Sequence, residues 1–146
     1  MSPLIHEDLV IIGLAGNEAM VKGMGESWEP DPVYQMHSWL TAIDTAPGTV
    51  QWRYQSSRPM VAAVTAPAAD LVFTGELNGD CIVIDGRDGS VLYRSNTGGA
   101  ISGGTATYQV GGKQYVAVTS GAATRFWTVP PAAATVVVFS LPKIEN

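Results

Sequence analysis

One pattern of five residues occurs twice, 41 positions apart, and it limits the fold more than any other feature. Each copy has two apolar residues, then an aspartate, a glycine four positions later and an aromatic residue four positions after that. The copies are Ala42, Ile43, Asp44, Gly48 and Trp52, and Val83, Ile84, Asp85, Gly89 and Tyr93. A period of about forty residues with this pattern is typical of β-propeller blades. The alternative is an unrelated pair of β-hairpins, because the same residue types are common in hairpin turns.

The residues of the repeat suit a turn followed by a docking contact. Each aspartate can accept backbone N–H bonds in the turn that it opens, and each glycine can adopt a conformation that a Cβ would resist. Trp52 and Tyr93 offer flat rings that can pack on a neighbouring blade, with a polar edge left for a hydrogen bond. We therefore expect both aromatic side chains to be mostly buried across a blade boundary.

Short β-prone segments predict about ten strands. The central segment, 70–99, predicts strands at 71–73, 82–84 and 91–93, with a hairpin turn at Asn78-Gly79. Further strands are predicted at 9–12, 39–43, 50–54, 60–65, 105–110, 114–119 and 135–141, with a stub at 4–5. Residues 60–95 then hold a complete set of four strands. The predicted fold is all-β, a partial β-propeller of about two and a half to three four-stranded blades.

The whole chain, 1–146, is expected to form this single domain, with a long loop or insertion at about 14–38 and a second loop at 122–134. A propeller closes with at least about four blades. This chain has material for fewer, so its outer edges are expected to pair with another chain or with the rest of a larger protein.

Composition excludes several classes of partner. Of the 146 residues, 46% are hydrophobic and 14% charged, and the net charge of −5 leaves no basic face for a nucleic acid. No apolar run approaches the roughly 18 residues of a membrane span. The first ten residues lack the pattern of a signal peptide, which a mature exported protein would also lack. Cys81 is the single cysteine, so no disulfide can form within the chain.

Four segments of the C-terminal half carry a resemblance to a known family. They are LVFTGELNGD (71–80), VLYRSNTGG (91–99), GGKQYVAVTSG (111–121) and TVVVFSLP (135–142). They closely resemble the C-terminal blades of the quinoprotein alcohol dehydrogenases, which are eight-bladed propellers that use pyrroloquinoline quinone (PQQ) and a calcium ion. The repeat resembles that family's tryptophan-docking motif, Ala-x-Asp-x-x-x-Gly-x-x-x-Trp, and its second copy departs from the motif at Val83 and Tyr93.

The N-terminal segment SPLIHEDLVIIGLAGNE (2–18) resembles a different, much earlier blade, which ends in Ser-Gly-Ala-Glu in the family. Only about residues 19–38 lie outside the resemblance. Several blades separate the early blade from the late ones in the family, so the chain looks like a truncated or internally deleted relative.

This resemblance implies a remnant of a cofactor site. Ala15, Gly16 and Asn17 match the backbone that contacts PQQ, and Glu18 matches the glutamate that binds calcium. A carboxylate suits calcium, but the ion takes six to eight oxygens and one carboxylate binds it weakly. The alternative is that Glu18 is a solvated loop acid. The family's aspartate base, adjacent-cysteine disulfide and Asp-Trp segment have no counterpart, so no catalytic residue is assigned.

Two functions of different class follow from these observations. In the first, the chain is a portion of a PQQ-dependent alcohol dehydrogenase, periplasmic by resemblance, that oxidises an alcohol when the full propeller is present. In the second, it is a non-catalytic β-propeller fragment that acts as a structural or self-associating interaction module.

Overall fold

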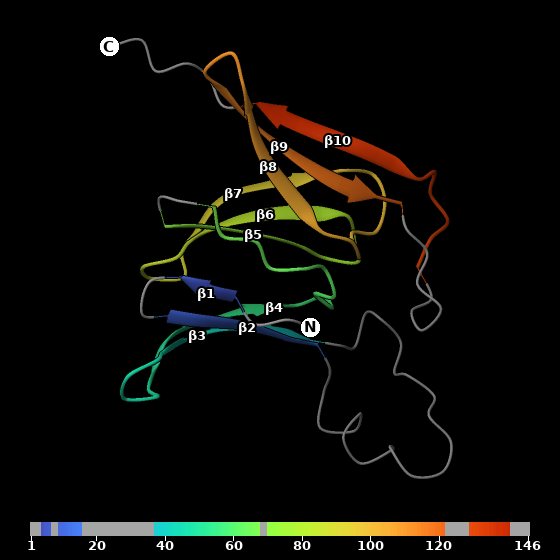
Figure 1. The fold of residues 1–146 in the computed structure, drawn as a ribbon. Coiled ribbons are helices and arrows are strands. Elements are labelled where there is room, and N and C mark those ends of the chain that lie inside the picture. The colour runs from blue at the N-terminus through green and yellow to red at the C-terminus, as the bar shows by residue number, and fades with distance from the viewer. Residues whose placement is uncertain (1–3, 7–8, 16–36, 68–69, 122–128, 141–146) are drawn as a thin grey trace, which may run out of the picture.

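The computed structural model describes residues 4–6, 9–15, 37–67, 70–121 and 129–140. These residues form ten strands and no helix, as the sequence predicts (Figure 1). The strands are β1 (Leu4–His6), β2 (Leu9–Ala15), β3 (Ser38–Asp44), β4 (Val50–Ser56), β5 (Leu71–Gly75), β6 (Asp80–Asp85), β7 (Val91–Asn96), β8 (Thr105–Val110), β9 (Lys113–Ser120) and β10 (Thr135–Ser140). The described residues include no helix long and apolar enough to cross a membrane.

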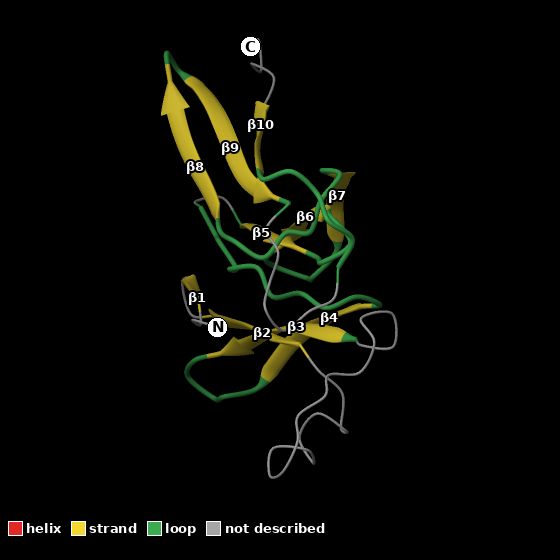
Figure 2. Cartoon of the chain, turned by 90° about the vertical axis from the view of Figure 1, so that its right-hand side faces the viewer, coloured by secondary structure: helices red, strands yellow, loops and turns green. Residues whose placement is uncertain are grey.

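The strands form three antiparallel sheets, which we number in chain order. Sheet 1 has the order β1-β2-β3-β4, sheet 2 has the order β5-β6-β7, and sheet 3 has the order β10-β9-β8. The sheets are layered one on another, with sheet 2 in the middle (Figures 1 and 2). Stacked antiparallel sheets of consecutive strands are the architecture of propeller blades, so the fold is a partial β-propeller.

The core lies in the two interfaces between these sheets. One cluster joins sheets 1 and 2 and contains Leu40, Ala42, Trp52, Met60, Val72, Ile82 and Ile84. A second cluster joins sheets 2 and 3 and contains Ala62, Phe73, Cys81, Ile101, Val116 and Val118. Strand β6 contributes to both clusters because successive side chains of a strand point to opposite faces. Strands β5 and β6 are therefore covered on both faces, which explains their largely apolar sequences, whereas β7 at the edge of sheet 2 is mostly exposed.

The 41-residue repeat predicts the local structure correctly. In each copy the aspartate carbonyl accepts a bond from the glycine N–H four residues later, at 3.0 Å for Asp44 and 2.9 Å for Asp85. Gly48 and Gly89 have φ values of +72° and +77°, which favour glycine. The strand pairing is also shifted by a bulge at the same point of each copy, after Ala42 in the first and after Val83 in the second.

Trp52 docks on the next sheet, as predicted. Its side chain is 7% exposed, and its Nε1–H donates a hydrogen bond of 2.8 Å to the carbonyl oxygen of Gly86. A Cβ at Gly89 would lie 2.7 Å from the indole ring, so the ring rests directly on this glycine. The turn between β6 and β7 is therefore the docking surface for the tryptophan of sheet 1.

The prediction that Tyr93 is mostly buried is wrong. Its side chain is 52% exposed, and it meets sheet 3 through an edge-to-face contact with Phe139, whose ring centroid is 6.2 Å away. Trp52, in contrast, rests on a turn, the one between β6 and β7. Phe139 lies within β10, so Tyr93 contacts a strand residue of sheet 3, and half of the tyrosine stays exposed.

The predicted strand at 60–65 is also wrong, because only Thr65 bridges to Phe73. Sheet 2 therefore has three strands instead of the expected four. The backbone of the segment is divided among different partners: the N–H of Met60 donates to the Ser38 hydroxyl, and that of Ala63 donates to the Gly103 carbonyl. The segment acts as a connection that places Met60 in one core cluster and Ala62 in the other.

Sheet 1 is more complete than the sequence predicts. The expected stub at 4–5 is the three-residue strand β1, which pairs along its whole length with β2. Strand β2 runs to Ala15, which pairs with Ser38, so both ends of the expected loop at 14–38 are in strands. Residues 16–36 lie outside the described residues.

The docking turn of sheet 2 contains a carboxylate of low pKa. The side chain and the backbone N–H of Arg87 both donate hydrogen bonds to the Asp85 carboxylate. The distances from Nε and from the backbone N to Oδ1 are both 2.9 Å. These bonds lower the pKa of Asp85 to about 2. A lowered pKa adds stability above the unfolded value of about 3.9, and this contribution is lost as the pH falls toward 2.

We expect a carbon-detected NMR titration of the Asp85 carboxyl to give a pKa of about 2. The Arg87→Gln variant should show a higher value, because it loses the ionic hydrogen bonds but keeps the backbone one. An unchanged pKa in that variant would mean that the turn backbone alone sets it.

Candidate functional site

The candidate site lies at one end of the stacked sheets. The connections β5–β6, β7–β8 and β9–β10 gather at this end, on the right of Figure 1, and β2 ends there too. The three docking-type or hairpin turns β3–β4, β6–β7 and β8–β9 lie at the opposite end. Ala15, one of the predicted cofactor residues, is the last residue of β2 and lies at this end.

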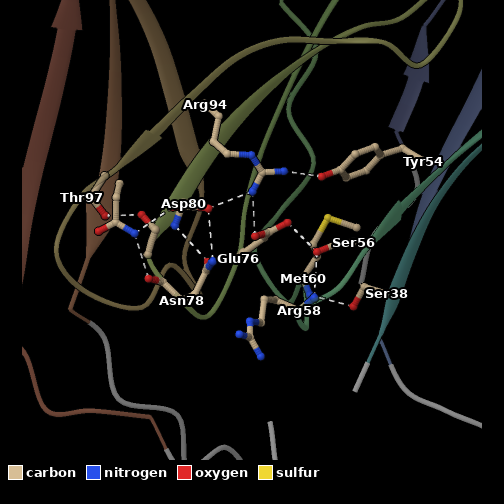
Figure 3. A network of polar contacts seen from close by, with 12 residues as sticks. Ser38, Tyr54, Ser56, Arg58, Met60, Glu76, Asn78, Asp80, Arg94 and Thr97 are labelled. Carbon is tan, nitrogen blue, oxygen red and sulfur yellow. Dashed lines mark hydrogen bonds and ion pairs between the residues drawn. The ribbon is translucent and has the colours of Figure 1, made fainter. Parts of the chain in front are cut away.

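A buried carboxylate, Glu76, is the centre of a polar network at this end (Figure 3). Glu76 follows β5 and is 2% exposed. Its Oε1 accepts a hydrogen bond of 2.5 Å from the Ser56 hydroxyl, and its Oε2 accepts one of 3.0 Å from Arg94. Because Ser56 is in sheet 1 and Arg94 is in sheet 2, the network joins two blades.

Arg94 has three partners. Its Nη1 also donates to Asp80 Oδ2 at 2.8 Å, and its Nη2 donates to the Tyr54 hydroxyl at 2.5 Å. Burial raises the pKa of Asp80, but hydrogen bonds from Arg94, Asn96 and Asn78 outweigh burial and lower it below its usual value. Burial and the charge of Glu76 raise the pKa of Tyr54. The guanidinium therefore neutralises two carboxylates and holds a phenol that remains protonated.

Two buried serines extend the network toward sheet 1. Ser38 and Ser56 pair across β3 and β4. The Ser38 hydroxyl accepts the N–H of Met60 at 2.8 Å, and the Ser56 hydroxyl accepts the N–H of Arg58 at 3.0 Å. Ala15 pairs with Ser38 on the other side, so this predicted site residue is placed one strand from the network. Gly16, Asn17 and Glu18 lie outside the described residues.

The described residues do not fit a calcium site. They contain no group of three His, Cys, Asp or Glu residues that could hold a metal ion. The two carboxylates of the network, Glu76 and Asp80, are already bonded to Arg94, which neutralises the charge that would attract a cation. We therefore assign no metal-dependent step to these residues.

Sequence reasoning missed this network, although Glu76 and Asp80 stand in one of the segments that carry the family resemblance. The second copy of the repeat could have indicated part of it, because its turn after Asp85 sets the register between β6 and β7. In that register Asp80 pairs with Asn96, which puts Arg94 diagonally next to Asp80 on the same face. The bond from Ser56 to Glu76 crosses between blades, and no local pattern signals it.

Comparison with known proteins agrees with the resemblance seen in the motifs. The dehydrogenase subunit of a quinone alcohol dehydrogenase from Acetobacter aceti is 32% identical over 118 residues, which are 80% of this chain and 16% of that protein. A quinoprotein ethanol dehydrogenase from Pseudomonas aeruginosa is 37% identical over 82 residues, 56% of this chain and 13% of that protein. No protein-family model matches the chain.

A solved structure shows the same fold. The quinohemoprotein alcohol dehydrogenase from Comamonas testosteroni aligns with 95% of this chain and 25% of that protein, with a TM-score of 0.68 and 21% identity. The chain spans less than a fifth of the length of the curated relatives it matches. It is therefore a relative of part of a quinoprotein alcohol dehydrogenase, folded as a partial β-propeller.

Proposed function

We propose that this chain forms a portion of a PQQ-dependent alcohol dehydrogenase, which oxidises an alcohol with the quinone and a calcium ion once the remaining blades are present. The observation that carries the proposal is the 32% identity over 80% of the chain to a quinone alcohol dehydrogenase subunit. Residues 1–146 would act as one partial-propeller domain, and a periplasmic location follows from the same resemblance.

Within that assembly, this chain would contribute one edge of the cofactor site. We assign backbone contacts with PQQ to Ala15, Gly16 and Asn17, and one calcium bond to Glu18. Support comes from the position of Ala15 at the blade end where the connections between strands gather. The described residues contain no cluster of metal ligands, so we assign the remaining calcium ligands and the base to other blades.

A complementation experiment tests this proposal. A quinoprotein alcohol dehydrogenase lacking the segment that this chain matches would be mixed with this chain, PQQ and calcium. We expect dye-linked ethanol oxidation only when both proteins are present, and a loss of at least tenfold with Glu18→Gln because calcium loses a charged ligand. Asp88→Asn, on an exposed turn at the opposite end of the sheets, is the matched control. Activity without this chain, or no activity with both proteins, would contradict the proposal.

The second candidate, a structural or self-associating module, is favoured by the outer face of sheet 3. This is the face of β8–β10 that points away from sheet 2. Its exposed apolar side chains are Tyr108, Val110, Val136 and Val138, with exposed fractions of 43–62%. Tyr108 stacks on Tyr115 on the same face, with ring centroids 5.3 Å apart. Exposed contiguous apolar surface of this kind often marks an interaction site.

We expect the isolated chain to sediment as species larger than one chain at low micromolar concentration. A second copy could continue the stack by placing its sheet 1 on the outer face of sheet 3, which is a head-to-tail contact. Val138→Glu should shift the distribution toward the monomer, whereas Ser57→Glu, at an exposed position after β4, adds the same charge outside both sheet faces and should leave it unchanged. A single species at the mass of one chain for the wild type would contradict self-association.

A further inference from the structure

A pocket of about 380 Å³ lies beside the polar network and shares Asn78 with it. Four segments line it: Arg58 shortly after β4, the β5–β6 turn, the β7–β8 connection, and residues 129–132 before β10. The lining residues are Arg58, Leu77, Asn78, Gly98, Gly99, Ala100, Val129, Pro130, Pro131 and Ala132. The volume is at the lower end of the range for small-molecule sites.

Hydrogen bonds and close packing fix the walls of this pocket. The N–H of Leu77 donates to the Pro59 carbonyl at 3.0 Å, which ties the turn to the segment that carries Arg58. The N–H of Gly121 donates to the Ala100 carbonyl at 2.9 Å. A Cβ on Gly99 would lie 2.8 Å from Gly121 and 2.9 Å from the Ala132 side chain. The lining segments are therefore packed in contact, and the pocket exists without a ligand.

The charge in this pocket comes from Arg58. It is the one charged residue among those that line it. Its backbone N–H is bonded to Ser56, but within the described part of the chain its guanidinium has no hydrogen-bond or ion-pair partner. In Figure 3 the guanidinium points away from the Glu76 network, with no dashed line to it. Arg94 differs, because two carboxylates and a phenol surround it.

The nearby acids do not cancel this charge. Glu76 and Asp80 are both bonded to Arg94. The side-chain amide of Asn78, which lines the pocket, donates to Asp80 and so stands between that carboxylate and the pocket. A half-buried guanidinium with five donors thus faces a space walled by proline, valine, leucine and alanine. That chemistry suits a carboxylate on an apolar body, since guanidinium binds carboxylate through paired hydrogen bonds.

We propose that this pocket binds a small organic carboxylate, with the carboxylate on Arg58 and the apolar part against Leu77 and the prolines 130 and 131. None of the residues assigned to the quinone or to calcium lines it, so the proposal does not depend on the proposed function.

The test is an NMR titration of the full chain with 2-naphthoate as the probe and 2-naphthamide as its uncharged match. We expect saturable amide shifts at Gly98, Gly99 and Ala100 with naphthoate, and binding at least about tenfold weaker with naphthamide, because an ionic hydrogen bond is lost. Arg58→Gln should weaken naphthoate binding to a similar degree, and Arg58→Lys should weaken it less.

Arg53→Gln is the matched control, since Arg53 is an exposed arginine on β4 outside the pocket and should leave binding unchanged. Amide spectra of each variant show whether the fold is kept. Three results would each overturn the proposal. The acid and the amide could bind equally, or the wild type and Arg58→Gln could bind naphthoate equally. The third is no shift at Gly98–Ala100 with about 10 mM naphthoate, a concentration tenfold above the dissociation constant of a millimolar site.

Discussion

Replacing Trp52 with alanine is expected to lower the free energy of unfolding by about 3–5 kcal/mol, the range for deleting a large buried aromatic side chain. The indole fills the interface between sheets 1 and 2, where it packs with the core cluster and rests on Gly89. Its loss also leaves the Gly86 carbonyl without the N–H that it now accepts at 2.8 Å. The measurement is urea unfolding followed by far-ultraviolet circular dichroism.

Trp39→Ala is the matched control for this prediction. Trp39 is on β3, in the same sheet, but it is 40% exposed and points away from sheet 2. Removing it should cost about 1 kcal/mol or less, as is usual for surface substitutions. Similar losses in the two variants would show that docking of Trp52 between blades does not stabilise this chain.

The part of the fold that could be predicted is the part set by local chemistry. In the repeat, the turn needs an aspartate to accept N–H bonds and a glycine to adopt positive φ, so a few residues specify both turns and the strands beside them. The docking of Trp52 followed from the same pattern, because the turn on which it docks is the second copy's turn in the same chain, with Gly86 34 residues after Trp52. Tyr93 has the same position in its repeat, but it contacts Phe139 within a strand and stays 52% exposed.

The parts that could not be predicted depend on distant partners. Residues 60–65 have the composition of a strand, yet their N–H groups go to Ser38 in one sheet and to Gly103 beside another. The candidate site is similar, because Glu76 becomes a buried carboxylate only through Ser56 and Arg94, 20 and 18 residues away. No period or motif reports such pairings. Motif resemblance located the family, whereas the charges at the blade end required the three-dimensional arrangement.

Replacing Arg94 with leucine is expected to destabilise the chain by about 3 kcal/mol at pH 7. Removing one member of a buried ion pair leaves the other charge uncompensated, which costs about 3–5 kcal/mol, and we take the low end because Arg94 itself is 39% exposed. Glu76 would keep the bond from Ser56 but lose its cation. Arg53→Leu, which removes an exposed arginine from β4, should change stability by no more than about 0.5 kcal/mol.

The pH dependence separates this electrostatic cost from simple loss of packing. The pKa of Asp80 is lowered in the folded wild type, so its contribution to stability is present above about pH 3.9 and is lost as the pH falls through the folded value. The Arg94→Leu variant lacks the hydrogen bond from Arg94 that helps to lower this pKa, so its deficit should shrink as the pH falls below about 3.9. Urea unfolding of both proteins at several pH values between 7 and 2 measures the difference. A deficit that stays constant over that range would mean that Arg94 stabilises the blade interface through its hydrocarbon stem and not through the charge of its guanidinium.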